Sequence, residues 1–336
     1  MACIRRGQRA LPSPLNASRI PIARYLSTTP QPNKPTDTVT IPSETDLNAP
    51  ISTLPIDLVT PPPIAPSAAL ADKLKRYVEF GRTYLTFYKT GLKNVYRNYR
   101  ASLPLRAQLG LPAYLPVSPP RESNASQQSK YSQLGRGQFQ LVCRSARDVR
   151  RMIPFTLILI VCGEFTPLIV PIFGSAITPA TCRVPSQVEK ERIASSKRKV
   201  AALRAAGVPV SVDAEQMEAL AGFVDLEWVA KAQAADVLRA CAVFGLVKSH
   251  EKVGGAVLAG LVYRPRLARY AEYLAVDDGM IRAGGVAGMS ATEVRIAVEE
   301  RGGVDVSGAF DGKQAEGLER RWLQQWLALR EKKSVQ

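Results

Sequence analysis

Apolar positions recur with a helical period along most of the chain after residue 69. In the first such stretch, steps of three and four place an apolar and aromatic set on one helical face: Tyr77, Phe80, Tyr84, Tyr88, Leu92, Val95 and Tyr99. Many Lys and Arg residues lie between them, opposed only by Asp72 and Glu79. The pattern predicts a basic aromatic amphipathic helix over residues 69–101. Such a helix either lies on a membrane surface or packs on other helices with its charges solvated.

The apolar run 153–174 is long enough to cross a bilayer. As a straight helix it spans roughly 33 Å, against about 30 Å for the hydrocarbon core. The run contains Glu164 and is interrupted by prolines, including Pro154 and Pro167. A charge at mid-depth costs about 2.5–3.5 kcal/mol, so Glu164 should face protein or water. We expect a transmembrane segment in which Glu164 lines an ion path or, as a neutral carboxyl, fixes helix packing. A buried hairpin that turns at residues 163–167 is the other interpretation.

The helical period returns in the carboxy-terminal half, over residues 183–330. No strand-like alternation of any length is present, so the expected class is all-α. Near the end, Ser290 suits a helix N-cap with Glu293 at the capping-box position, and Gly302 suits a helix stop. We expect the following two helices to pack together through Val294, Val298, Leu323 and Trp326. The sequence thus predicts a single transmembrane helix followed by a helical domain that ends in a helix–loop–helix.

The remaining segments are typical of a targeting sequence and of linkers. Residues 1–26 are rich in Arg and contain no acid, since the first carboxylate is Asp37. This composition is typical of a mitochondrial presequence, with processing before Ser27, although a basic disordered tail would share it. Residues 27–68 are Pro-rich and predict a disordered linker. Residues 102–135 predict a second linker, and residues 136–152 a basic juxtamembrane helix.

Composition narrows the classes of function. The 336-residue chain has a formal net charge of +16, one histidine and five cysteines without a C-x-x-C pair. These features argue against a His-based triad, a zinc ribbon and a disulfide scaffold. We expect no metal, no cofactor and no enzymatic activity. The positive charge favours an anionic partner, either nucleic acid or a lipid surface.

Two parts of the chain resemble a known family. The first runs from Gly135-Arg136-Gly137 through Arg147-Asp148 to Glu164 and Pro179-Ala180-Thr181; the second from Tyr273-Leu274 and Asp277-Asp278 through Gly284-Gly285-Val286 and Arg301-Gly302 to Arg321-Trp322-Leu323 and Trp326-Leu327. Both are similar to the Letm family, the leucine-zipper and EF-hand-containing transmembrane proteins of the mitochondrial inner membrane, with their ribosome-binding domain. The last motif also resembles a SAP-type helix–loop–helix.

The resemblance implies a single-pass inner-membrane protein with its carboxy-terminal domain in the matrix, at the mitochondrial ribosome. It implies a role in membrane insertion of new proteins and in cation homeostasis. The family's transmembrane carboxylate falls at Glu164. Basic residues of the domain are candidates for contact with ribosomal RNA and proteins: Arg264, Arg266, Arg269, Arg301, Arg320 and Arg321. A solvated basic face without RNA contact is the plain alternative.

A second function follows from the same resemblance. Potassium/proton or calcium/proton exchange would use Glu164 and the proline-interrupted span. It would need a homo-oligomer in the inner-membrane lipid, because one span cannot enclose a path. Ribosome binding is carried instead by the basic helical domain, so substitutions in the two regions would separate the hypotheses.

Overall fold

The structure is a computed structural model that describes residues 41–43, 45–58, 61–62, 69–111, 134–162, 178–210, 214–251, 255–308 and 310–335. These residues form helices, turns and extended segments and include no strand, which confirms the all-α class for the described part. One compact unit spans residues 38–336. The expected presequence, residues 1–26, lies outside the described residues.

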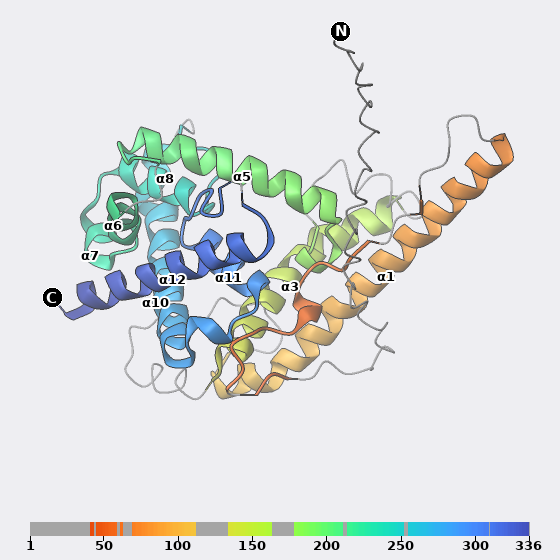
Figure 1. Ribbon diagram of the computed structural model, residues 1–336, viewed down its shortest axis with the longest axis horizontal. Coiled ribbons are helices and arrows are strands. Elements are labelled where there is room, and N and C mark those ends of the chain that lie inside the picture. Colours follow the sequence, from red (N-terminus) through yellow and green to blue (C-terminus); the bar gives the residue numbers. More distant parts are fainter. Residues whose placement is uncertain are drawn as a thin grey trace, which may run out of the picture. The chain divides into compact units, whose positions relative to one another are not determined.

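Two long helices, α1 (Leu70–Gln108) and α3 (Arg136–Cys162), pack side by side (Figure 1). Leu105 near the end of α1 packs in the same cluster as Phe139 at the start of α3, while Phe87 packs in a second cluster with Phe155. The two helices therefore run antiparallel. The expected amphipathic helix is confirmed, but it continues into the segment expected as a linker.

Helix α3 joins the expected juxtamembrane helix to the first part of the run 153–174, and Pro154 lies inside it. Residues 163–177, which include Glu164 and Pro167, lie outside the described residues. None of the described helices combines the length and hydropathy needed to cross a membrane.

The expected linker 27–68 is wrong for residues 45–58, which we name the strap. Leu47, Ala49 and Thr53 of the strap are buried. The strap is held by hydrogen bonds from distant residues, because Arg136 Nη1 donates to Leu47 O at 2.9 Å and Asn98 Nδ2 donates to Ser52 O at 2.9 Å. Its prolines leave an extended backbone whose polar groups find partners elsewhere in the fold.

The carboxy-terminal half is a series of helices with local sequence reasons for their ends. Pro185 opens α5, Asp225 caps α7 by accepting from Glu227 N at 2.8 Å, and Gly302 ends α11 with φ +87°. The bounds are α5 Pro185–Ala205, α6 Ala214–Phe223, α7 Leu226–Lys231, α8 Ala234–Val243, α9 Gly255–Leu258, the π-helical turn η5 Ala259–Tyr263, α10 Arg264–Gly284, the 3₁₀ turn η6 Val286–Gly288, α11 Ala291–Glu300 and α12 Gly312–Val335.

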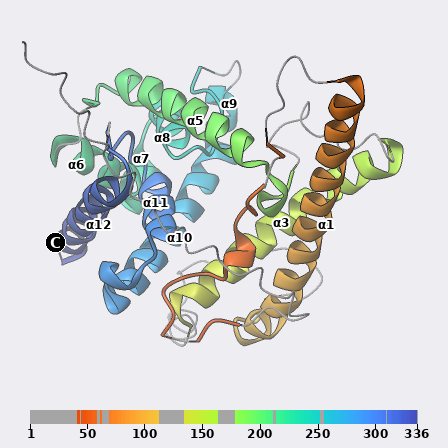
Figure 2. The same ribbon diagram turned by 45° about the vertical axis from the view of Figure 1, so that its right-hand side comes forward.

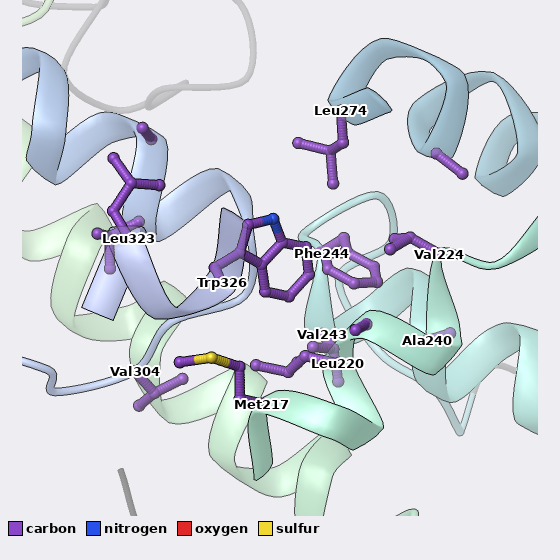
Figure 3. Packing of buried hydrophobic residues seen from close by; sticks show 14 of the residues in the cluster. Met217, Leu220, Val224, Ala240, Val243, Phe244, Leu274, Val304, Leu323 and Trp326 are labelled. Atoms are coloured by element: carbon purple, nitrogen blue, oxygen red, sulfur yellow. The ribbon is translucent and has the colours of Figure 1, made fainter. Parts of the chain in front are cut away.

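The main core lies among these helices. Trp326 of α12 is fully buried, in one cluster with Leu220, Val243 and Leu274 (Figure 3). Val294, Val298 and Leu323 belong to the same cluster, so the expected packing of the last two helices is confirmed. The hydrophobic core of the expected helical domain at 183–330 is nevertheless not made by that domain alone, since Leu47 of the strap belongs to the same cluster.

Candidate nucleic-acid interface

Three of the six candidate arginines are exposed. Arg266 and Arg269 lie on the first turns of α10, and Arg321 lies on α12. The spacing of three puts Arg266 and Arg269 on one face of their helix. Neither forms an ion pair with another described residue. These two guanidinium groups are therefore placed to contact an anionic partner.

Arg264 and Arg320 are half-buried and serve the fold. Arg264 donates to Val229 O at 2.6 Å, to Ala232 O at 2.7 Å and to Ala230 O, which satisfies the last carbonyls of α7. Arg320 donates to Val286 O and Met289 O, both at 2.6 Å, and pairs with Glu316. The expectation that both present their charge to solvent is wrong, because each guanidinium is occupied by backbone carbonyls.

Arg301 is the clearest correction, because its side chain is 0% exposed. Its Nη2 lies 2.8 Å from Asp277 Oδ2 and 2.6 Å from Asp278 Oδ1. Trp326 Nε1 also donates to Asp278, at 3.1 Å. Burial alone would lower the pKa of Arg301, but the two carboxylates raise it above its usual value. Arg301 is a buried structural cation and cannot touch RNA in this conformation.

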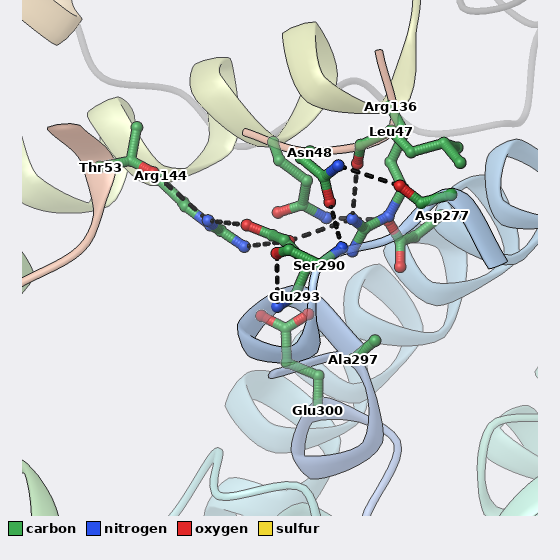
Figure 4. A network of polar contacts seen from close by, with 12 residues as sticks. Leu47, Asn48, Thr53, Arg136, Arg144, Asp277, Ser290, Glu293, Ala297 and Glu300 are labelled. Atoms are coloured by element: carbon green, nitrogen blue, oxygen red, sulfur yellow. Dashed lines mark hydrogen bonds and ion pairs between the residues drawn. The ribbon is translucent and has the colours of Figure 1, made fainter. Parts of the chain in front are cut away.

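Asp277 also binds a second arginine, from α3, so the charges form one network that joins α3, α10 and α11 (Figure 4). Arg136 Nε lies 2.8 Å from Asp277 Oδ1, and its Nη1 lies 3.1 Å from Glu293 Oε2. Arg144 pairs with Glu293 at 2.7 Å. We name the set Arg136, Arg144, Asp277, Asp278, Glu293 and Arg301 the charge network. Its three cations and three anions balance, as buried charges require.

The pKa of Asp277 reports how strongly the network holds its charge. Burial would raise the pKa of this carboxyl, but Arg136 and Arg301 together bring it well below its usual range. The sequence indicated no structural role for Arg136 and Arg144, and it suggested a turn or helix cap at Asp277-Asp278, which is wrong because both aspartates lie inside α10. One available signal was the spacing: Asp277 and Asp278 lie between Leu274 and Ile281, so helical periodicity places carboxylates on an otherwise apolar face.

An exposed apolar patch lies just before Arg266. Val257 is 79% and Leu261 81% exposed on α9 and η5, and Val262 is exposed as well. Val262, Arg266 and Arg269 follow one another at steps of four and three along the helix. π-helical turns such as η5 occur frequently at functional sites. This exposure was not predicted from the sequence, where Val257 to Val262 indicate only a further helix.

A polar cavity of about 340 Å³ lies between α5, α11 and residues 303–311. Buried Lys199 lines it and donates to Glu299 O at 2.5 Å, and burial lowers the pKa of Lys199 to about 8. Arg192 pairs with Glu299 at 2.5 Å and Arg295 with Glu319 at 3.1 Å. Arg192 and Arg295 are thus paired with carboxylates of the cavity and Lys199 with a backbone carbonyl, so the cavity offers no cluster for a phosphate group.

Other expected site residues give no chemistry in the described part. Pro154 is a half-buried residue inside α3, and Glu164 and Pro167 lie outside the described residues. Ion exchange through Glu164 therefore stays a prediction. Within the described ranges, no group of three or more His, Cys, Asp or Glu side chains is placed to hold a metal ion.

No family model, no curated protein and no solved structure matches this chain.

Proposed function

We propose that this protein is a mitochondrial inner-membrane protein whose helical domain lies in the matrix and binds mitochondrial ribosomes. In that position it would support membrane insertion of new proteins and cation homeostasis. The proposal is supported by the presequence-like start, the apolar run 153–174 and the resemblance to the Letm family. The Arg266/Arg269 face of α10 is the observation that carries it.

This face suits a ribosome for physical reasons. Its two guanidinium groups have no competing carboxylate among the described residues, so binding an RNA phosphate breaks no ion pair there. Arg266 and Arg269 flank Leu267, which is fully buried and fixes the turn. The exposed Val257 and Leu261 nearby could take the apolar part of a ribosomal protein. Recognition would rest on charge and shape and would weaken steeply as salt rises.

The test is co-sedimentation of the full chain, in detergent, with purified mitochondrial ribosomes across a salt series. Binding should fade as salt rises. The double variant Arg266→Glu/Arg269→Glu should weaken it at least tenfold and flatten its salt dependence, because two cationic contacts are removed.

The matched control is Lys190→Glu/Lys197→Glu, which changes the net charge equally at two exposed positions of α5. We expect this control to keep most of the affinity. An equal loss in both double variants would show that only overall charge matters, and no sedimentation of the unmodified chain at low salt would reject ribosome binding.

A further inference from the structure

The two flanks of the expected transmembrane run touch each other. Asp148 on α3 precedes the run, and Ala180 in the 3₁₀ turn η4 (Ala180–Cys182) follows it. Asp148 Oδ1 accepts the backbone N–H of Ala180 at 2.7 Å. Thr181 Oγ1 then donates to Gly91 O of α1 at 3.3 Å, and the side chain of Cys182 is buried against the same helix.

Contacts farther from the run also join residues that precede it to residues that follow it. Before it, Arg136 and Arg144 of α3 supply two of the three cations of the charge network, whose other members follow it. The strap also reaches across, since Asn48 Oδ1 accepts from Ser290 N at 2.8 Å and Asn48 Nδ2 donates to Gly288 O at 3.1 Å. These contacts involve buried, charged or backbone groups that need a specific partner.

A single crossing is incompatible with these distances. A segment that crosses a bilayer once separates its ends by about 30 Å of hydrocarbon. Here the groups on either side of residues 153–174 lie 2.7 Å apart at Asp148–Ala180 and 2.8 Å apart at Arg136–Asp277. Both flanks must therefore share one side of any membrane that the protein binds.

The described helices also show which end would meet a membrane. At the end of α3, Ile153, Leu157, Ile160 and Val161 are exposed; Leu157 is 59% and Ile160 74% exposed. The antiparallel start of α1 exposes Leu70, Leu74, Tyr77, Val78 and Leu85. Phe155 is buried against Phe87 and Tyr88 just behind these residues. We name the exposed set the apolar end; Figure 2 shows α1 and α3 side by side in a second view.

We propose that the protein docks on the membrane through the apolar end and that the described residues from 45 to 152 lie on the same side as those from 178 onward. This inference rests on the proposed membrane attachment and replaces the single crossing expected from the sequence. The bound state is monotopic: side chains of the apolar end enter one leaflet, and the helical domain stays in water with α1, α3 and the strap.

A bilayer fits the apolar end better than a second copy of the chain. The exposed residues at the end of α3 belong to the run 153–174, whose sequence is long and apolar enough to contact a bilayer. Exposed Lys75, Arg82 and Lys89 lie along α1 and complement anionic headgroups.

The first experiment is vesicle flotation of the full chain. Vesicles of phosphatidylcholine with about 20% cardiolipin, an anionic lipid that basic residues bind, are compared with phosphatidylcholine alone. We expect flotation that is stronger with cardiolipin and that falls at least tenfold in Leu157→Glu/Ile160→Glu. The control is Val257→Glu/Leu261→Glu, which changes an apolar residue of α9 and one of η5 that are at least as exposed as Leu157 and Ile160. This control should float like the unmodified chain. If the α3 variant floats like the unmodified chain, the apolar end is not the docking surface. A concentration-dependent dimer without flotation would assign that end to a second copy.

The second experiment tests the side of the membrane directly. In a background with Cys3 and Cys162 replaced by Ser, the pair Asn48→Cys/Ser290→Cys should form an intramolecular disulfide on oxidation, both in detergent and on vesicles. The remaining cysteines, Cys143, Cys182 and Cys241, are buried and their pKa is raised to about 12, so they should stay unreactive.

The outcomes separate this inference from the proposed function. A disulfide that forms in detergent but not in the vesicle-bound protein would restore a single crossing. Failure to form it in detergent would remove the contact on which the inference depends. Loss of flotation with an intact disulfide would reject membrane attachment while leaving ribosome binding to be judged by sedimentation.

Discussion

At the scale of single residues, several charged residues of the sequence motifs stabilise the fold as members of the charge network. Asp277, Asp278 and Arg301 belong to the segments that resemble the Letm family, and their side chains are buried and paired. Arg264 and Arg320 use their guanidinium groups to hold carbonyls of neighbouring elements. Some arginines of this chain therefore hold its interior together, and others are exposed. On α10, Arg266 and Arg269 are the exposed candidates.

The first prediction concerns Asp277. Replacing it with Asn leaves Arg136 and Arg301 buried with one carboxylate fewer, so the free energy of unfolding should fall by about 3–5 kcal/mol. Denaturant unfolding of the full chain measures the change. Asp236→Asn is the control, because it breaks a half-exposed pair with Arg239 and should cost under about 1 kcal/mol. Equal losses would mean that burial does not strengthen the pairing.

Acid should weaken the same network. The pKa of Asp277 is lower in the folded chain than in the unfolded one, so its contribution is complete above about pH 4 and declines as the pH falls toward the folded value. Unfolding measured from pH 6 down to pH 2 should show this loss. In Asp277→Asn the slope over that range should be smaller, and an unchanged slope would contradict the assignment.

Lys199 provides a prediction of opposite sign. Its folded pKa of about 8 lies below the usual 10.5, so between these values the unfolded lysine binds a proton that the folded one lacks. The free energy of unfolding should therefore rise with pH across this window, by roughly 3 kcal/mol. Lys199→Met should remove the rise, whereas Lys197→Met, at an exposed position, should keep it. A rise that survives in Lys199→Met must come from another group.

At the scale of elements, periodicity predicted the helices well and the strap not at all. The apolar spacing of α1, α11 and α12 is local, so the sequence displays it. The apolar residues of the strap do not follow a helical period, two prolines interrupt it, and its partners, such as Gly288 and Ser290, are distant in sequence. The capping box was also only partly predictable. Ser290 Oγ accepts from Glu293 N at 3.4 Å, as the sequence predicts. The Glu293 carboxylate, however, binds Arg136 and Arg144, and Ser290 N donates to Asn48 Oδ1 instead.

Two glycines of α10 test how firmly the strap is seated. A methyl group on Gly284 would overlap the Leu47 side chain, whose backbone is fixed on both sides, so Gly284→Ala should cost about 1–3 kcal/mol. Gly279→Ala meets nothing within 4 Å and should stabilise the same helix by about 0.5–1 kcal/mol. Thermal unfolding of both variants gives the comparison. If both changes stabilise the protein, the strap yields easily and its contacts contribute little.

At the scale of the whole molecule, the basic charge and the docking surfaces lie on one folded unit. The candidate surface on α10 was predictable only in part, because sequence identifies basic residues but not which of them are turned inward. Arg301 is turned inward because it pairs with Asp277 and Asp278, and Arg264 is turned inward because it donates to a carbonyl at the end of α7. Tertiary contacts of this kind leave no periodic trace in the sequence.

The last prediction is that the carboxy-terminal half does not fold well alone. A fragment of residues 183–336 retains Asp277 and Glu293 but loses Arg136 and Arg144, which leaves buried carboxylates short of cations. It also exposes the side chains that pack on Leu105 and Phe139. Its unfolding should be broad or shifted at least 10 °C below that of the full chain.

The cause can be isolated within the fragment itself. Adding Asp277→Asn and Glu293→Gln to residues 183–336 should restore part of the lost stability, because a buried amide is far less costly than an unpaired carboxylate. The same double change in the full chain should destabilise it, since there it removes the partners of three arginines. This reversal of sign is the signature of a network shared between the two halves. A fragment that unfolds cooperatively at the temperature of the full chain would show instead that α1, α3 and the strap only dock on a finished domain.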